Sequence, residues 1–500
     1  MELLTTKFKN KIKGILSCYD RVILQGTIPG ICYAEGMTAY LYAKQIRIFD
    51  FYENAKQWRN QIILNVEKIA IKNGLKIEYI RKKNFRKETK IKKILKKRGY
   101  HPGLVYIFSA VESCYTFKPW YDKKNKKAFL ISTPSKCLHY YFYFIDQKLG
   151  LCYMRVPTWA PFRLQFYFNG HNLLASKLRK KRIKFQLIDN AFVYISNFIK
   201  AQNLANNFSV EEIHKKLDKY AKKLCPIIKH FNQYYHWSNM QTEYAMDIVF
   251  KQQKDLKPIY EEIIRTMIHT VKPENIATFL GRKLHGNYQD EMGNDFKTRI
   301  NGTRILHKMG KSWIKMYDKF GLILRIEVTS YNISFFKHFR KVEHRDGSSS
   351  MKFAPFKKSI YSLKPLLGIF NACNKRYLEF ISCIQDNTAG IKKLNKISEP
   401  AKENNRKYKG LNLFNNDDLI ILQSLLAGEY NISGFQNKNL REKIPQKNMG
   451  QISRILKRLR IHGIIKKIRN TYKYYLTKFG KQVISLGLKL KELYIIPALT

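Results

Sequence analysis

The sequence predicts a multidomain α+β protein, and three observations lead to that prediction. Its 500 residues exceed what one hydrophobic core organises, because domains usually run to about 100–200 residues. Hydrophobic residues make up 45% of the chain and aromatic residues 14%, which is enough to fill several cores. The hydrophobic period also changes along the chain, from alternating strands and helices to clustered strands, and finally to three helices and a hairpin.

The first part of the chain, residues 1–135, has the pattern of an α/β domain. Its opening stretch, MELLTTKFKNKIKGIL, predicts a basic amphipathic helix. Strands and helices are then expected to alternate, with strands at 21–28, 75–81 and 103–112 and helices at 34–73 and 87–99. Strand–helix–strand order favours a largely buried sheet.

The central part, residues 136–385, is predicted to be rich in strands and then in helices. Strands are expected at 139–146, 149–158, 162–170 and 184–195, the first two as a hairpin, and residues 196–283 are expected to be mainly helical. From 303 to 329 the period returns to two, which predicts a three-stranded antiparallel meander. Residues 386–411 lack apolar periodicity and are expected to form a linker.

The last part, residues 412–500, predicts three helices at 415–428, 437–444 and 448–463, followed by a hairpin at 464–477. This is the element order of a winged helix, a variant of the helix-turn-helix. In the third helix Ile452, Ile455, Leu456 and Leu459 are expected to share the inward face.

Polar residues on the third helix and the hairpin are candidate contacts to nucleic acid. Arginine and glutamine read guanine and adenine edges in the major groove, and lysines on a wing meet phosphates. The candidates are Gln451, Arg454, Lys457 and Arg458 on the helix, and Lys466, Lys467, Arg469 and Lys473 on the hairpin.

The phrase RLRIHGIIKK…YYLTKFGK resembles the winged helices of MarR-like regulators, over about residues 415–485. The resemblance implies a winged-helix fold and DNA binding; a winged helix that mediates protein contacts is the alternative. The whole chain also resembles a bacterial family with winged-helix C-termini, from which no activity follows.

The net charge predicts a polyanionic partner. Lys and Arg number 93 against 37 Asp and Glu, a formal charge of +56. Such a field repels itself unless an anion neutralises it, and the usual anion is nucleic acid. DNA is the expected partner; RNA or single-stranded DNA is the alternative, since exposed aromatics beside basic residues stack unpaired bases. A membrane partner is not expected, because no stretch of 18 apolar residues occurs and the N-terminus lacks signal-peptide features.

The eight cysteines form no C-x-x-C pair, so neither a zinc site nor a disulfide framework is expected. Buried thiols in a reducing cytoplasm are the expected state of these cysteines.

The predicted meander holds candidate catalytic residues. On SWIKMYDK, Lys315 and Tyr317 share one face, and on LILRIEVT, Arg325 and Glu327 share one face. A tyrosine attacks phosphorus, cations stabilise the phosphoryl oxygens, and a carboxylate holds Mg²⁺ or Mn²⁺. The alternative is a solvated sheet face with a cross-strand ion pair, which contributes only a few tenths of a kcal/mol to stability.

This stretch also resembles a motif of rolling-circle replication initiators, in which a Y-x-K strand precedes an LRIE-like strand. The matching residues are Tyr317, Lys319, Arg325 and Glu327. The resemblance implies a tyrosine that nicks DNA with the help of a divalent metal. A His-x-His metal strand is absent from the sequence; the nearby strands offer only His139 and His171.

Asp20, Glu112 and Asp146 lie at or near predicted strand ends. A nuclease or transposase of the RNase H type projects carboxylates from adjacent strands onto two cations, although a strand-end aspartate is also a common turn former. Glu327 and Asp20 are therefore the candidate metal ligands.

Together these patterns predict a nucleic-acid-binding protein of a mobile element with a metal-dependent nicking or transposase-like centre. The alternatives are a non-enzymatic DNA-binding regulator and an RNA-binding partner of a structured RNA.

Overall fold

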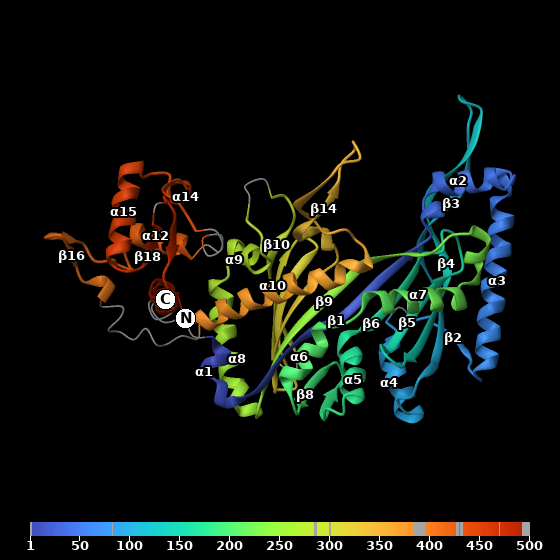
Figure 1. The fold of residues 1–500 in the computed structure, drawn as a ribbon, viewed down its shortest axis with the longest axis horizontal. Coiled ribbons are helices and arrows are strands. Elements are labelled where there is room, and N and C mark those ends of the chain that lie inside the picture. The colour runs from blue at the N-terminus through green and yellow to red at the C-terminus, as the bar shows by residue number, and fades with distance from the viewer. Residues whose placement is uncertain are drawn as a thin grey trace. The chain divides into compact units, whose positions relative to one another are not determined.

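The computed structural model describes residues 3–82, 84–284, 288–299, 302–384, 396–426, 430, 434–469 and 471–492. Figure 1 traces the fold of these residues, and their contacts divide the chain into two compact units. Unit 1 comprises Met1–Leu16, Ala245–Thr329 and Ile369–Thr500, and unit 2 comprises Ser17–Tyr244 and Ser330–Gly368. Both units combine helices with sheet strands, so the predicted multidomain α+β class is confirmed. The predicted domain boundaries at 135, 385 and 411 stay predictions.

The sheet strands of unit 2 follow the order β1–β6–β5–β4–β3–β2. All neighbours are antiparallel except β2, which pairs parallel to β3. The bounds are β1 Ile12–Thr27, β2 Ile77–Tyr79, β3 Gly103–Asp122, β4 Lys127–Asp146, β5 Gly150–Pro157 and β6 Leu164–Asn169. Aromatic and β-branched residues favour these strands, and Phe142 and Phe166 are completely buried.

Helices and two separate hairpins complete unit 2. The helices are α2 Ala34–Ala43, α3 Phe51–Lys72, α4 Lys87–Arg98, α5 Gly170–Lys180, α6 Phe198–Asn206 and α7 Val210–Leu224. The hairpins are β7 Phe185–Ile188 with β8 Ala191–Ile195, and β14 Lys337–Glu343 with β15 Ser349–Pro355. The Ser209 hydroxyl accepts the Glu212 N–H and so caps the start of α7.

Unit 1 contains the predicted three-stranded meander, β11, β12 and β13, together with β10 and the part of β9 from Ala245 onwards. Its sheet order is β10–β11–β12–β13–β9, with antiparallel pairing along β10, β11 and β12. The bounds are β9 His236–Phe250, β10 Met292–Arg299, β11 Gly302–Met309, β12 Ser312–Lys319 and β13 Ile323–Ser330. Every residue of β13 is buried, so neither of its faces is the solvated one that the alternative interpretation required.

The helices that precede the C-terminal module in unit 1 are α1 Leu4–Lys7, α8 Gln253–Thr270, α9 Pro273–Phe279 and, from Ile369 onwards, α10 Leu363–Ile384. Among the described residues, no helix combines the length and apolar character that crossing a bilayer demands.

The structure corrects several secondary-structure predictions; the single strand expected at 184–195, for example, is the hairpin of β7 and β8. The expected N-terminal helix is a single turn, because the chain joins the sheet from Ile12 onwards. Residues 196–283 are mainly helical as expected, through α6, α7, α8 and α9, but they also contain the 15-residue strand β9, which was not predicted. Residues Ala245–Phe250 of β9 are buried on both faces, so the alternation that marks a half-exposed strand is missing there.

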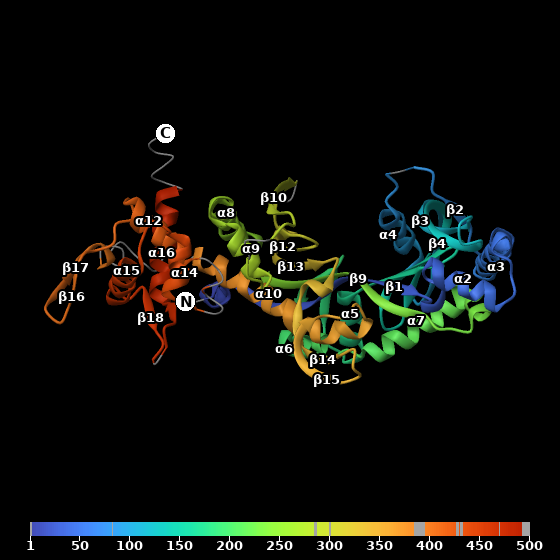
Figure 2. The same ribbon diagram turned by 90° about the horizontal axis from the view of Figure 1, so that it is seen from above.

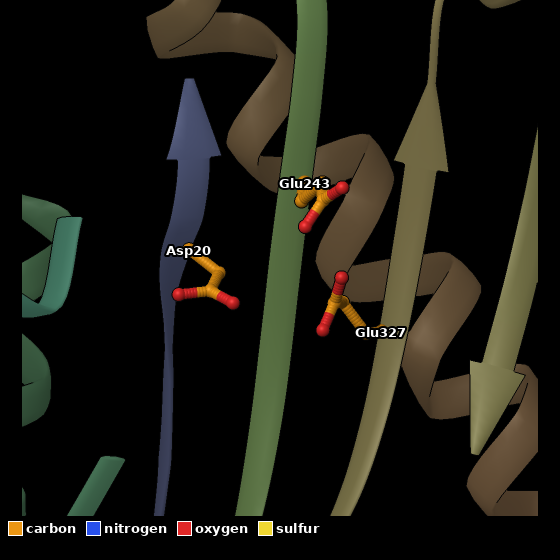
Figure 3. A group of neighbouring side chains, drawn as sticks. All are labelled: Asp20, Glu243 and Glu327. Atoms are coloured by element: carbon orange, nitrogen blue, oxygen red, sulfur yellow. The ribbon is translucent and has the colours of Figure 1, made fainter. Parts of the chain in front are cut away.

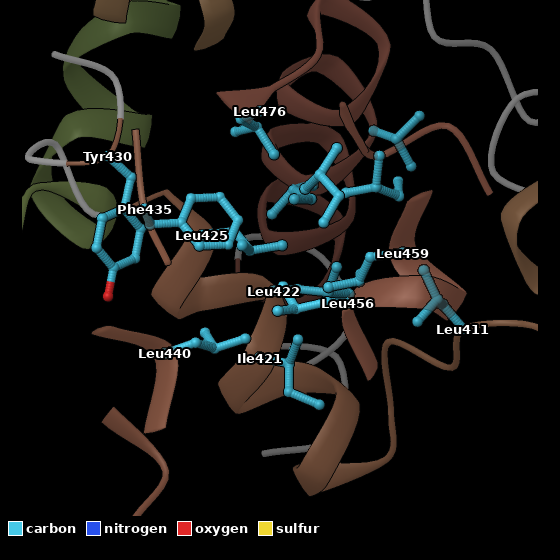
Figure 4. Close-up of a cluster of buried hydrophobic side chains, with 14 of the residues drawn as sticks. Leu411, Ile421, Leu422, Leu425, Tyr430, Phe435, Leu440, Leu456, Leu459 and Leu476 are labelled. Atoms are coloured by element: carbon cyan, nitrogen blue, oxygen red, sulfur yellow. The ribbon is translucent and has the colours of Figure 1, made fainter. Parts of the chain in front are cut away.

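The C-terminal module has the predicted order of three helices and a hairpin (Figure 2). Its elements are α12 Asn416–Leu425, α14 Asn437–Lys443, α15 Met449–Ile461, β18 Ile465–Lys467, β19 Tyr474–Leu476 and α16 Lys478–Leu490. Leu422, Leu456 and Leu459 belong to one buried cluster at its centre (Figure 4). The expected linker, in contrast, carries a hairpin, β16 Ala401–Glu403 with β17 Arg406–Tyr408; residues 385–395 and Asn470 lie outside the described part.

Candidate metal centre and nucleic-acid interface

Three acidic side chains converge from three neighbouring strands. The strands β13, β9 and β1 are hydrogen-bonded neighbours in that order, and they carry Glu327, Glu243 and Asp20 respectively. One carboxylate oxygen of each residue lies within 4.8 Å of those of the other two. Figure 3 shows the three carboxylates at the corners of a triangle, each projecting from its own strand. We call these three residues the acidic triad; Asp20 and Glu327 are buried and Glu243 is partly buried.

Glu327 is held by two residues of β12. Lys315 Nζ lies 2.6 Å from Glu327 Oε1, and Tyr317 Oη donates a hydrogen bond to Oε2 over 2.8 Å. Lys315 and Tyr317 are two positions apart on a strand, so both face Glu327. The predicted catalytic tyrosine and lysine therefore contact the predicted metal ligand directly.

Asp20 is held by side-chain amides. Asn169 donates to Asp20 Oδ1 over 2.7 Å, and Asn190 donates to both carboxylate oxygens over 2.7 Å. The Nδ1 atom of His171, considered above together with His139, lies 3.2 Å from Oδ1 and so stands beside a triad carboxylate. Asn169 also caps α5 with its side-chain oxygen, which fixes its own orientation. These contacts preorganise Asp20.

Glu243 is the member of the triad that sequence reasoning missed. It lies on β9, inside the region that was expected to be helical, and its Oε1 accepts a hydrogen bond from Gln241 over 2.8 Å. The signal that was available is the run EYAMDIVF, whose aromatic and β-branched residues favour a strand.

Arg325 occupies a different place from the predicted one. Its side chain is completely buried, and its guanidinium binds the Asp247 carboxylate through two hydrogen bonds of 2.6 and 2.7 Å. A buried bidentate pair of this kind joins β13 to β9. The predicted contact between Arg325 and a phosphate is therefore replaced by a structural contact, because β13 lies in the interior of the sheet.

Glu112 and Asp146 are also engaged elsewhere. Burial acts to raise the pKa of Glu112, but the Tyr141 hydrogen bond and the Arg155 charge outweigh it and leave the pKa below its ordinary value. Burial likewise acts on Asp146, whose pKa is lowered overall by hydrogen bonds from Lys216 and other donors. Each carboxylate thus has its own cation and neither belongs to the acidic triad.

The C-terminal module exposes most of the predicted nucleic-acid contacts. The exposed ones are Gln451, Arg454, Lys457, Lys466, Lys467, Arg469 and Lys473. They lie on α15 and on the β18–β19 hairpin or its turn. Gln451 Oε1 also accepts the Asn448 N–H and completes a capping box at the start of α15, so its side chain is partly used within the fold.

Arg458 is the exception on α15. Its guanidinium makes two hydrogen bonds of 2.8 Å to Asp418, and a third to the carbonyl of Lys409. Because Asp418 is buried on α12, it needs a counter-charge, and Arg458 supplies it. Arg458 therefore fastens α15 to α12 instead of facing outward with Arg454.

No family model, curated protein or solved structure matches the chain. The resemblances to winged helices and to replication initiators thus stay predictions, and the function is inferred from the geometry. Carboxylate oxygens are the ligands that Mg²⁺ and Mn²⁺ favour, and three of them leave coordination positions for water and substrate oxygens.

Proposed function

We propose that the chain is a nucleic-acid-binding protein of a mobile element that cleaves or transfers phosphodiester bonds. In this proposal Asp20, Glu243 and Glu327 hold one or more Mg²⁺ or Mn²⁺ ions, and the C-terminal module binds duplex DNA. The observation that carries the proposal is the convergence of three acidic side chains in a chain with a formal charge of +56.

Electrostatics explains why this convergence favours a cation. Carboxylates placed this close repel one another, and burial strengthens the repulsion because the local dielectric constant is low. Lys315 offsets part of the negative charge at Glu327. A divalent cation among the three oxygens would supply further positive charge, and it would do so where a phosphate must approach.

The residues around the triad suit phosphodiester chemistry. A bound cation would polarise a phosphoryl oxygen and lower the pKa of a bound water. Lys315, which pairs with Glu327, would stabilise negative charge that develops on nearby phosphoryl oxygens. Asn169 and Asn190 hold Asp20 in a fixed orientation, which reduces reorganisation when substrate binds.

The nucleophile is either the Tyr317 hydroxyl or a water molecule. Tyr317 Oη already donates to Glu327 Oε2, and that carboxylate is a ready acceptor for the phenol proton. A tyrosine nucleophile leaves a covalent phosphotyrosine link to DNA, whereas a water nucleophile leaves none. Tyr317→Phe separates the two, because it abolishes nicking only in the first case.

The decisive experiment measures nicking of supercoiled DNA by the full-length chain with Mg²⁺, Mn²⁺ or EDTA. We expect activity with either metal, and a fall of about 100- to 1000-fold in Glu243→Gln, the size of loss seen when one charge-stabilising group is removed. Calorimetric titration with Mn²⁺ should show weaker binding to the same variant. The matched control is Glu53→Gln, which makes the same change at an exposed residue of α3.

The metal centre would be contradicted if the Glu243→Gln variant kept full nicking activity, or if it bound Mn²⁺ as tightly as the wild-type chain. Nicking that proceeds equally well in EDTA would contradict it too.

The exposed polar and basic side chains on α15 and on the β18–β19 hairpin support a second candidate function, a DNA-binding regulator without enzymatic activity. It predicts sequence-specific duplex binding and no cleavage under any metal condition. Sequencing the nucleic acid that co-purifies with the full-length chain would distinguish both from an RNA-binding role, which predicts bound structured RNA.

A further inference from the structure

The hairpin of β14 and β15 is a two-stranded ribbon that pairs with no other strand of the described chain. Figure 1 shows it projecting as an isolated ribbon, labelled β14. The two strands are seven residues each and are joined by a turn at His344–Gly347, in which the Gly347 N–H donates to the His344 carbonyl. We call this ribbon the arm.

One face of the arm is exposed along its whole length. Cross-strand pairing places Phe339 opposite Phe353, and Lys341 opposite Met351. Phe339 is 69% exposed, Phe353 60% and Met351 62%. The two phenyl rings lie against each other, with centroids 6.0 Å apart and planes inclined by 50°. Exposed apolar groups gathered in this way mark a surface that binds a partner.

The charges around this patch indicate the nature of the partner. Lys337 and Lys341 lie two residues before and two residues after Phe339, so all three side chains are on the same face of the strand. Both lysines are exposed. Arg345 is exposed at the turn and Lys352 on β15, and these four cations outnumber the two exposed carboxylates of the arm, Glu343 and Asp346. Cations that flank an apolar patch on a narrow ribbon match a partner in which phosphates flank stacked bases.

We propose that the arm enters a groove of duplex DNA and that Phe339 and Phe353 wedge into a base step and unstack it. A two-stranded ribbon fits the grooves of B-form DNA, whereas the major groove of A-form RNA is too deep and narrow for it. Apolar side chains that insert between base pairs are a known means of kinking a duplex. The inference rests on the DNA binding in the proposed function, but not on the acidic triad or on cleavage.

The test uses the full-length chain and a duplex that carries 2-aminopurine, whose fluorescence rises when its base is unstacked. Catalysis is blocked with EDTA. Because the preferred base step is unknown, the probe set places 2-aminopurine at TA and CA steps, the steps that deform most easily. Affinity is measured in parallel by anisotropy of a fluorescein label at the duplex end.

We expect the wild-type chain to raise the 2-aminopurine signal and the double variant Phe339→Ala/Phe353→Ala to lose that rise. Loss of aromatic stacking should also weaken affinity by about 5- to 100-fold. The matched control is Phe49→Ala, which removes a phenyl ring of similar exposure, 61%, elsewhere in unit 2. Circular dichroism checks that each variant is folded.

Binding without any rise in fluorescence, or a rise that the double variant retains, would overturn the wedge while leaving nucleic-acid binding intact. The wedge would also be overturned if the wild-type chain formed a dimer that the double variant no longer formed, while the affinity of the double variant for DNA stayed unchanged. Binding to RNA alone would overturn the choice of duplex DNA. Absence of binding to any nucleic acid would remove the proposed function as well.

Discussion

Glu327 is the residue that connects the acidic triad to the predicted catalytic residues of β12. Its carboxylate contacts Lys315 and Tyr317 from β12, and it lies beside Glu243 and Asp20 from β9 and β1. The sequence predicted both Glu327 and Asp20 as metal ligands, and the structure brings them together; whether they bind a metal stays a prediction. Alternation along a strand identifies which residues share a face, but it does not identify the neighbouring strand, so Glu243 was missed.

Arg325 shows the opposite outcome at the same scale. The alternation on β13 placed it on the face of Glu327, yet its guanidinium is committed to Asp247. Burial of both partners was not visible in the sequence, because it depends on which strand lies next to β13.

Arg325→Ala is expected to destabilise the fold by about 3–5 kcal/mol, because it leaves the buried Asp247 carboxylate without its counter-charge. Urea unfolding followed by tryptophan fluorescence measures the loss. Replacing both residues with apolar ones, Arg325→Met with Asp247→Leu, should recover much of the stability. Equal losses in the single and double variants would show that the charge pair itself, and not the orphaned carboxylate, sets the stability.

At the scale of elements, α15 was predicted within one or two residues at each end, because its capping box and apolar spacing are local features. The β12 and β13 strands were also predicted, since short turns separate strands of period two. In contrast, β9 was missed because a strand buried on both faces lacks alternation. The N-terminal helix was predicted to be too long, because pairing of the chain with the sheet from Ile12 onwards overrides its local preference for helix.

The different placements of two arginines on α15 predict different effects. Arg454→Ala removes an exposed side chain and should weaken DNA binding by about 1–3 kcal/mol at unchanged stability. Arg458→Ala leaves Asp418 buried without its partner and should lower the stability of the C-terminal module instead. Binding titrations and thermal unfolding of both full-length variants make the comparison. A purely thermal effect of Arg454→Ala would argue against its contact with DNA.

At the scale of the whole molecule, the charge balance was readable from the sequence but the sheet connections were not. The excess of Lys and Arg follows from the composition alone and does not depend on the fold. It supports the expectation of a polyanionic partner. The neighbours β1, β9 and β13 come from segments far apart in the sequence, and such non-local pairing leaves no local periodicity.

This charge predicts a steep dependence of binding on salt. If six or more phosphates are bound, affinity for duplex DNA should fall by about 10³-fold or more between 50 and 200 mM NaCl. Replacing Lys466, Lys467 and Lys473 together with alanine should reduce the slope of log K against log salt by about one for each phosphate that the variant no longer neutralises. A shallow slope for the wild-type chain would mean that counterion release plays little part.

The amide of Asn190 has a practical consequence for anyone who wishes to observe this centre. It sits in the two-residue turn between β7 and β8, next to Asp189 with φ of 51°, and reaches Asp20 from there. Its side-chain nitrogen is thus a built-in spectroscopic sensor: isotope labelling of asparagine should reveal an arriving ion as a displaced resonance, without any foreign dye or change of residue.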